Sequence, residues 1–486
     1  MTPAAFAKLQ IVAPGETAAP GTPAGKSGTP DNQIADILFA VTVNAVDDFW
    51  NVVNSVVDTV SITTTDAFAT VPLAQPLVAG TRNFSMSLAT ATTSIITATD
   101  VANGLITPAS VAISAGPGAP TKLLFGQQPG SPATAGVNFS PQPIVEIQDI
   151  AGNVSLTATH TITLMAYSDI TCTTPATRTL NGGGGLPAVS GVVTFTAVNY
   201  EGADDIYLRA TAAGLTSACS TLVDMNPATA TKLVFTQQPS SSATAGANFA
   251  QQPVVQIQDQ FGNRTADSDS VTLTPFMNAS CTDAASGTLN GGGAQGANAG
   301  EATFSAVNYE KAETFYLKAT SGSLTAACST SIAVTPAAFV KLQILAPGES
   351  AEPGTPSGKS GAPLSQTAGA PFNLTVNGVD AFWNKVASAS DAISITTSDV
   401  NVTPPANKSL NLGTTSFSVT LKSAGNHTVT ATDVTDSAKT PSTTGPITLN
   451  AAVFSKLQIL APGETALPGS ASGKIGAPAG QTPAGR

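Results

Sequence analysis

Apolar and polar positions alternate along most of this 486-residue chain, with a period close to two residues. In the first hundred residues the alternation predicts strands over Phe6–Val12, Ile37–Val46, Val60–Thr64, Phe84–Leu88 and Thr93–Thr99. A strand with one buried face produces this period, whereas an amphipathic helix would produce a period of 3.6 residues. No stretch sustains the helical period. The pattern therefore predicts an all-β protein built from short strands.

The first strand recurs, which indicates a tandem array of one module type. It begins at Lys8, Lys122, Lys232, Lys341 and Lys456, so successive copies lie 114, 110, 109 and 115 positions apart. The spacing predicts four complete modules and the first strand and loop of a further, incomplete one: 1–116, 117–226, 227–335, 336–450 and 451–486. Modules one and four resemble each other, and so do modules two and three.

Each complete module has about seven short strands in about 110 residues. This size and rhythm are typical of an immunoglobulin-like β-sandwich, in which two antiparallel sheets enclose one core. A β-helix is the alternative, but its repeats are far shorter. We therefore expect tandem immunoglobulin-like domains arranged as beads on a rod.

The composition excludes several classes of partner. Charged residues make up only 10 % of the chain, and the net charge is −11. Binding to nucleic acid or to an anionic membrane needs basic patches, so we expect neither. No apolar run approaches 18 residues, so we expect no membrane insertion in this segment. Because Met1 precedes a repeat strand and not a signal peptide, we expect the chain to be cut from a longer protein.

The four cysteines fall into two pairs with the same spacing. Cys172 and Cys219 are 47 positions apart, and so are Cys281 and Cys328. One pair per module indicates one disulfide in each, and hence an extracellular or cell-surface location. A zinc site is the alternative, but it lacks the close Cys-x-x-Cys spacing.

Modules two and three share a pattern of a strand, an Asp-x-x-Gly-Asn turn and a further strand. In module three the pattern lies in KLVFTQQPSSSATAGANFAQQPVVQIQDQFGN (232–263), and in module two it lies in the corresponding segment, 122–153. These segments resemble the bacterial immunoglobulin-like domains of invasin- and intimin-type proteins and of giant secreted surface repeat proteins. The resemblance implies the sandwich fold and an extracellular setting. It also suggests that Tyr207 and Tyr316 form the tyrosine corner of such domains.

Two kinds of loop stand out. Glycine runs at 181–185 and 290–293 fit hairpin connections with positive φ. A Pro/Gly loop of some twenty residues follows the first strand of modules one and four and of the last fragment. Its prolines have no N–H group to donate to a strand ladder, so we expect the loop to lie as an extended strap along its own module or a neighbouring chain.

Every complete module carries an Asp-x-x-x-Asn turn: Asp47/Asn51, Asp149/Asn153, Asp259/Asn263 and Asp380/Asn384. Asp and Asn side chains stabilise such turns by bonding nearby backbone N–H groups. A Ca²⁺ site is the alternative, although each turn supplies too few acidic ligands on its own. We expect no other cofactor.

The aromatic pairs Phe49–Trp50 and Phe382–Trp383 are the candidate contact surface. They replace residues of the turn, including the glycine found in modules two and three. They could cover their own module, seal against the next module, or stack on a sugar ring.

The sequence gives no support for a catalytic function. The two histidines, His160 and His427, lie in Thr-rich strands without a nucleophile or acid partner. The GKSG sequence of the Pro/Gly loop resembles part of a nucleotide-binding P-loop. However, only three residues separate Gly21 from Gly25, where a P-loop needs four. We expect no enzyme.

The sequence thus favours an extracellular structural protein, a stalk, filament or surface-fibre component that associates with itself or with neighbouring modules. An adhesin that binds a glycan or a host surface is the alternative. In the last fragment an unpaired strand could add to another sheet. Its candidate assembly residues are Phe454, Lys456, Leu457, Ile459 and Leu460.

Overall fold

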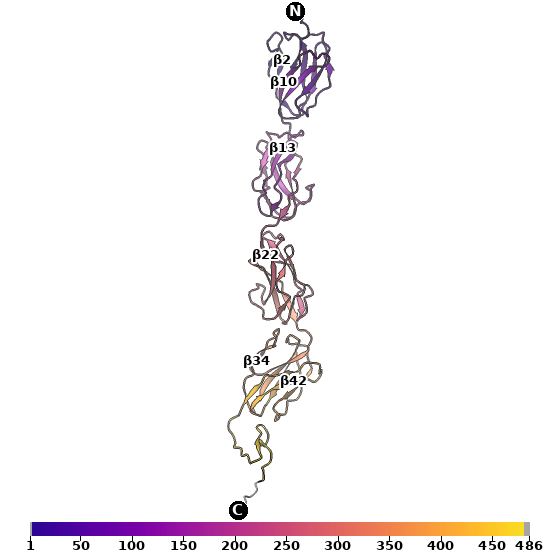
Figure 1. The fold of residues 1–486 in the computed structure, drawn as a ribbon. Coiled ribbons are helices and arrows are strands. Elements are labelled where there is room, and N and C mark those ends of the chain that lie inside the picture. Colours follow the sequence, from indigo (N-terminus) through magenta and orange to yellow (C-terminus); the bar gives the residue numbers. More distant parts are fainter. Residues whose placement is uncertain (1, 481–486) are drawn as a thin grey trace, which may run out of the picture. The chain divides into compact units, whose positions relative to one another are not determined.

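The computed structural model describes residues 2–480, and every regular element in that range is a β-strand. The chain divides into two compact units, residues 1–228 and 229–486. Figure 1 shows the strands of each unit as arrows. The all-β prediction is confirmed. Within residues 2–480 no helix is long and apolar enough to cross a membrane.

Module one is a sandwich of two sheets. The three-stranded sheet contains β1 (Lys8–Val12), β5 (Phe39–Val46) and β8 (Thr81–Met86) in that order. The five-stranded sheet contains β4 (Gln33–Ile34), β10 (Ala109–Gly116), β9 (Thr93–Asp100), β6 (Thr59–Thr64) and β7 (Gln75–Pro76). β4 pairs in parallel with β10, so the first part of the module contributes to both sheets.

Modules two and three repeat this plan. Module two contains β11 (Lys122–Gln127), β12 (Ala133–Thr134), β13 (Ile144–Gln148), β14 (Thr161–Tyr167), β15 (Leu180–Asn181), β16 (Leu186–Pro187), β17 (Val192–Thr194), β18 (Asn199–Tyr200), β19 (Tyr207–Thr211), β20 (Ala218–Cys219) and β21 (Met225–Asn226). Module three contains β22 (Ala230–Gln237), β23 (Ser242–Thr244), β24 (Val254–Asp259), β25 (Ser270–Phe276), β26 (Leu289–Asn290), β27 (Gln295–Gly296), β28 (Glu301–Thr303), β29 (Asn308–Tyr309), β30 (Thr314–Thr320), β31 (Ala327–Cys328) and β32 (Ile332–Thr335).

Module four follows module one closely. Its strands are β33 (Lys341–Leu345), β36 (Gln366–Thr367), β37 (Phe372–Val379), β38 (Ala392–Thr397), β39 (Lys408–Ser409), β40 (Thr414–Val419), β41 (Gly425–His427), β42 (Val429–Asp433), β43 (Ser442–Thr443) and β44 (Ile447–Asn450). β33, β37 and β40 form one sheet in the same order as β1, β5 and β8.

Each complete module has its own hydrophobic core. Along β5, Val41 and Val43 are buried, whereas Ala40 lies on the outer face of the sheet and is exposed. Side chains that alternate in this way bury one face of each sheet against the other. The four cores are separate clusters, one within each complete module. The immunoglobulin-like sandwich therefore repeats four times.

Disulfides join Cys172 to Cys219 and Cys281 to Cys328. These are the pairs that the sequence spacing indicates. Cys219 lies in β20 and Cys328 in β31, at the edge of a sheet. Each bond therefore fastens the loop after β14 or β25 to a short edge strand of the same module.

The glycine runs are not hairpins, contrary to the prediction. Gly182 and Gly291 do have positive φ values, 72° and 70°. However, β15 pairs with β18 whereas β16 pairs with β14, so the run connects strands of two different ladders. The spacing of Asn and Gly indicated a turn but not which strands pair across it.

The tyrosine prediction is also wrong. Within residues 2–480 the tyrosine hydroxyl groups with hydrogen bonds are those of Tyr200, to Asp204, and Tyr309, to Glu313 and the N–H of Gly287. Both rings are fully buried, and burial raises the pKa of Tyr200 to about 12. Tyr207 and Tyr316 are half-buried strand residues one strand further on.

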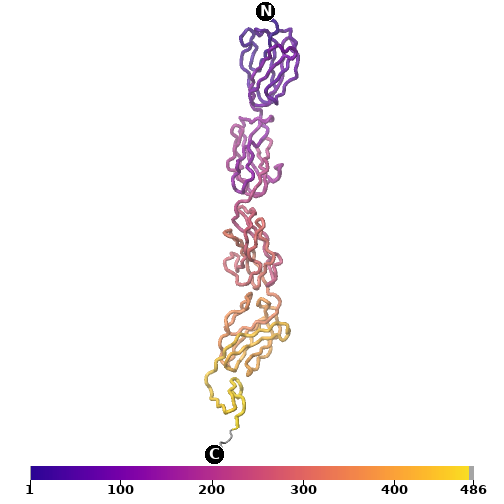
Figure 2. Tube along the Cα trace, in the orientation of Figure 1, coloured from indigo at the N-terminus to yellow at the C-terminus, as the bar shows by residue number. Residues whose placement is uncertain are grey.

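The C-terminal segment, residues 451–480, has no sandwich of its own. Figure 2 shows it in yellow as a separate loop beside module four. The strand expected at Phe454–Leu460 is absent, because no neighbouring strand pairs with it. Two short strands, β45 (Thr465–Ala466) and β46 (Lys474–Ile475), form a hairpin.

Candidate functional site

The Pro/Gly loop folds as a hairpin, and the expectation of an extended strap is wrong. In module one β2 (Glu16–Ala18) pairs with β3 (Lys26–Gly28), and in module four β34 (Glu349–Ala351) pairs with β35 (Lys359–Gly361). The prolines lie outside these short ladders, so they remove no ladder hydrogen bond. An ion pair closes each hairpin, Lys26–Glu16 and Lys359–Glu349, both at 2.8 Å.

A buried glutamine fastens the hairpin to its own module. In module one the Gln10 side-chain amide donates to the carbonyl of Gly25 at 2.7 Å, and Asn44 donates to Gln10 Oε1 at 2.9 Å. In module four Gln343 and Asn377 make the same two bonds, at 2.6 Å to the Gly358 carbonyl and 2.9 Å to Gln343. The hairpin is thus coupled to the first two strands of the sheet.

Trp50 and Trp383 each contact this hairpin and a lysine of the same module. A Cβ atom on Gly25 or Gly358 would collide with the indole ring, so only glycine permits the contact. The ammonium groups of Lys8 and Lys341 lie over these rings, 3.6 and 3.4 Å from the ring centroids. Burial lowers the pKa of Lys341, and the nearby Asp380 opposes that change.

Both tryptophans have a φ of 69°, a conformation that is unfavourable for a residue with a Cβ atom. Gly152 and Gly262 occupy the same position in modules two and three, with φ values of 95° and 86°. The stacked contacts offset a backbone cost of about 1–2 kcal/mol. These contacts hold the tryptophans, which are half-buried, against their own modules.

The adjacent phenylalanines differ from each other in their surroundings. Phe382 packs against the core of module three, with its ring against Gly246. Phe49, the corresponding residue of module one, is 67 % exposed. Of the four residues of the candidate contact surface, Phe49 is therefore the one that presents most of an aromatic ring to solvent.

The Asp-x-x-x-Asn turns satisfy their own carboxylates. In module one Asp47 accepts hydrogen bonds from the N–H groups of Phe49, Asn51 and Ala4. Burial raises the pKa of Asp47, but these bonds and one from the Asn51 side chain more than offset the rise and leave it lowered. The carboxylate stays ionised through N–H donors from its own module.

The asparagine of this turn also bridges to the preceding module. Asn153 of module two donates to the Ala89 carbonyl at 2.8 Å and accepts from the Ala91 N–H at 2.9 Å. In module four, Asn384 makes the same pair of bonds, each 2.7 Å long, to the Glu310 carbonyl and the Ala312 N–H. The side-chain amide thus pairs with the backbone of module one or module three as a strand would.

An aspartate shapes the loop that receives the asparagine in module one, and an equivalent aspartate shapes the corresponding loop of module four. In module one Asp66 accepts from the N–H groups of Ala89 and Thr90, at 2.8 and 2.9 Å. In module four Asp399 accepts from those of Lys422 and Ser423, at 2.6 and 2.8 Å. Burial opposes ionisation of Asp399, but these bonds outweigh it and lower its pKa to about 2.

The sequence predicted the turns but not the hydrogen bonds that the asparagines make to the preceding module. The asparagine that recurs at the end of each turn could have indicated these bonds, because the turn itself needs only the aspartate to accept its N–H groups. What the asparagine contacts depends on a loop more than sixty positions earlier in the chain. No local pattern marks that loop.

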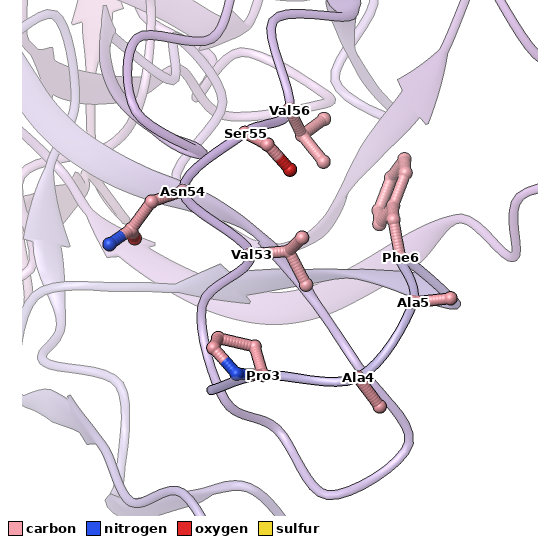
Figure 3. Close-up of a pocket in the computed structure, with 8 residues that line it drawn as sticks. All are labelled: Pro3, Ala4, Ala5, Phe6, Val53, Asn54, Ser55 and Val56. Carbon is pink, nitrogen blue, oxygen red and sulfur yellow. The ribbon is translucent and has the colours of Figure 1, made fainter. Parts of the chain in front are cut away.

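Residues 2–480 hold no group of three or more His, Cys, Asp or Glu side chains placed to bind a metal ion. Figure 3 shows a surface hollow of module one between Pro3–Phe6 and Val53–Val56, whose side chains are apolar except for Asn54 and Ser55. Among the described residues His427 contacts Ser423 and Ser398, with no acidic partner.

The candidate assembly residues of the C-terminal segment are exposed. Leu457 is 87 % and Ile459 is 84 % exposed, and Phe454, Lys456 and Leu460 are exposed too. In modules one and four the residues that correspond to Leu457 and Ile459 are core residues, at most 2 % exposed. The segment therefore presents apolar side chains that the same sequence buries elsewhere in this chain.

No protein-family model matches the chain, and no curated protein matches its sequence. Weak likenesses to solved structures exist. Domains 1–6 of the surface layer protein SbsC are 14 % identical, with 91 % of this chain and 57 % of that chain covered and a TM-score of 0.19. Invasin, a bacterial integrin-binding protein, is 13 % identical, with 91 % and 79 % covered and a TM-score of 0.26.

Extracellular domains 3–5 of Drosophila OTK are 14 % identical, with 69 % of this chain and 99 % of that chain covered and a TM-score of 0.21. The chain spans little more than half the length of the SbsC structure. Likenesses at these TM-scores carry no argument about function. The functional inference therefore rests on the chain's own residues.

Proposed function

We propose that this chain is an extracellular or cell-surface structural protein, a component of a stalk, filament or surface fibre. The observation that carries the proposal is the repeated bridge between consecutive modules, made by Asn153 and by Asn384 with the same two hydrogen bonds. A bond pair that recurs at equivalent positions favours a protein selected for joining modules end to end.

Two further observations support this function. The disulfides of modules two and three suit an oxidising compartment, where small domains commonly carry them. Each module has its own core, so modules can be added to an array while contacts are shared only between neighbours. The structural role needs no catalytic group.

Immunogold labelling of the source cells with an antibody against module two tests the location and the function together. We expect label on the cell surface or on fibres released from it. Label confined to the cell interior would contradict the proposal.

The adhesin alternative rests mainly on Phe49, which is 67 % exposed, because the tryptophans and Phe382 are half-buried and packed against protein. A glycan array with the wild-type chain and with Phe49→Ser tests it. Binding that the substitution removes would favour an adhesin, and binding to no glycan would leave the structural function as the better account.

A further inference from the structure

Modules one and four each carry a pair of aspartates at the same place in the sandwich. In module one, Asp58 directly precedes β6 and Asp100 ends β9. Asp100 lies opposite Val60 in the β6–β9 ladder, and Asp58 is two positions before Val60. Residues two positions apart along a strand share a face, so Asp58 and Asp100 are diagonal neighbours. In module four Asp391 precedes β38, Asp433 ends β42, and the ladder has the same register.

The second aspartate of each pair is deeply buried, and only one of its two oxygens is satisfied. Asp100 is 3 % and Asp433 is 2 % exposed. In both residues Oδ1 accepts two N–H groups of the turn that follows, at 2.9 and 3.0 Å. Within residues 2–480 no donor gives a hydrogen bond to Oδ2 of either residue. A buried oxygen without a donor is costly, so these two atoms need an explanation.

A neighbouring module does not supply the missing donor. Module four follows module three within one compact unit, and Oδ2 of Asp433 still has no donor there. The explanation therefore lies within the pair itself.

The group that faces this oxygen is the other carboxyl group of the pair, which is half-buried. The side chains of Asp58 and Asp100 lie within hydrogen-bonding reach of each other, and so do those of Asp391 and Asp433. Two ionised carboxylates would repel each other, because neither has a proton to donate. A single proton on the half-buried carboxyl group replaces this repulsion with a charge-assisted hydrogen bond to Oδ2.

In module one no basic group compensates the pair. Burial and the charge of Asp100 raise the pKa of Asp58, and no cation of the described residues acts against this rise. Arg82, whose guanidinium reaches β7, donates to the Pro76 carbonyl instead. The negative charge of this pair is therefore left to a proton.

In module four two further charges lie near the pair. Burial and the charge of Asp433 raise the pKa of Asp391; Lys439 opposes the rise and Asp436 adds to it, both with smaller effects. Lys439 and Asp436 form an ion pair with each other at 3.1 Å. Lys408, on the strand next to β38, donates to the Ser416 carbonyl. The pKa of Asp391 stays raised in spite of the nearby lysine.

Modules two and three have no such pair and serve as internal comparisons. Their ladders place His160 and Ala212 at the two positions in module two, and Asp269 and Ser321 in module three. The carboxyl pair thus belongs to the two modules that carry the Pro/Gly hairpin and no disulfide.

We infer that each pair holds one proton between its two carboxyl groups, and that this proton makes modules one and four more stable in mildly acidic surroundings than at neutral pH. The shared proton fastens the start of β6 to the end of β9, and the start of β38 to the end of β42. When it leaves, two carboxylates face each other and Oδ2 has no donor. The inference concerns stability and does not depend on the proposed structural function.

Mild acid should stabilise these modules because the folded pKa of Asp58 and of Asp391 lies above the ordinary value of 3.8. Their contribution to stability is complete below pH 3.8 and is lost as the pH rises through the folded pKa. Each unit of difference corresponds to about a ten-fold change in the unfolding equilibrium. Asp399 acts in the opposite direction, but only below its ordinary value of 3.8, so the two effects occupy different pH ranges.

Hydrogen exchange of the full chain, resolved by peptide and expressed relative to the intrinsic rate at each pH, tests the inference. As the pH falls from neutral towards 3.8, protection of β38 and β42 should rise by about ten-fold for each unit by which the pKa of Asp391 exceeds that value. β6 and β9 should behave in the same way. β25 and β30 of module three should show no such rise. An equal rise in module three, or none in modules one and four, would overturn the inference.

Asp391→Asn supplies the missing donor without a proton. The amide has the shape of the acid and can donate to Oδ2 of Asp433 at every pH. We expect module four of this variant to be protected at neutral pH and to lose the acid-dependent rise, while module one keeps it. Asp269→Asn is the matched control, because Asp269 has the same position without a carboxyl partner, and it should change neither. An Asp391→Asn variant with the pH dependence of the wild type would overturn the shared proton.

Calcium distinguishes a shared proton from a shared cation. Carboxylate oxygens are the ligands that Ca²⁺ prefers, so a pair that binds it would stabilise its module when Ca²⁺ is added at neutral pH. We expect added Ca²⁺ to leave the protection of β38 and β42 unchanged. A rise in the wild type that Asp391→Asn abolishes would overturn the shared proton and indicate a cation site instead.

Discussion

A single asparagine side chain takes the place of a short strand at the module junctions. A carboxamide has the same donor and acceptor as a peptide group, so Asn384 can pair with the backbone of module three in both directions. The Asp380 carboxylate holds this side chain in place through a third bond at 2.9 Å. The turn and the junction therefore depend on the same two residues.

Asn384→Ala should uncouple modules three and four. The change leaves the Glu310 carbonyl and the Ala312 N–H without partners at a place where Asn384 is only 1 % exposed. We expect a loss of about 1–3 kcal/mol and much faster amide exchange at Ala312. Asn51→Ala is the control, because Asn51 makes only bonds within its own turn. An equal loss in both variants would contradict the bridge.

Acid should loosen the end of module four. The folded pKa of Asp399 is about 2, below its ordinary value of 3.8, so its contribution to stability is complete above pH 3.8. That contribution is lost as the pH falls towards 2 and the carboxylate takes up a proton. We expect the amides of Lys422 and Ser423 to lose protection over this range, measured as exchange relative to the intrinsic rate at each pH, and in Asp399→Asn already at neutral pH. Protection that does not change with pH would contradict this role.

At the scale of the element, the Pro/Gly hairpin is a folded clasp. Its position could be predicted from the sequence, since the near-identical text occurs three times directly after a strand. Its structure could not, because the contacts that fold it come from Gln10 on β1 and from Trp50 beyond β5. Residues distant in sequence thus turn a segment rich in proline into a paired element.

Trp383→Ala should open the hairpin of module four and leave that of module one closed. The change removes the ring that lies against Gly358 and under Lys341. Limited trypsin digestion should then cleave after Lys359 faster than in the wild type, with Lys26 unchanged. Trp50→Ala should give the reverse result. Cleavage at both lysines in either variant would show that the hairpins are not held by their own tryptophans.

At the scale of the whole molecule, two kinds of module are stabilised in different ways. Modules two and three carry a disulfide and a short loop after the first strand. Modules one and four have no cysteine and carry the hairpin clasped by a tryptophan. Because each core is separate and the bridges join only neighbouring modules, a change in module three should leave the stability of module one unaltered.

The double substitution Cys281→Ser/Cys328→Ser tests this independence. Loss of a disulfide that closes a loop of this size should destabilise module three by roughly 4 kcal/mol in the chain-entropy model. Hydrogen exchange resolved by peptide should show this loss in the core of module three, around Ile257 and Leu317, and no change in module one. A uniform change across the chain would mean that the modules unfold together.

The sequence by itself determined the β class, the repeat, the number of cores and the cysteine pairs. Those features follow from alternation and spacing, which are local or periodic properties. The tertiary structure decided what the turns and loops do. Whether Phe49 is exposed and Phe382 covered, or whether Asp433 faces another carboxyl group, depends on which backbone lies opposite each residue. That information is long-range, and nearly identical local sequences have different contacts in modules one and four of this chain.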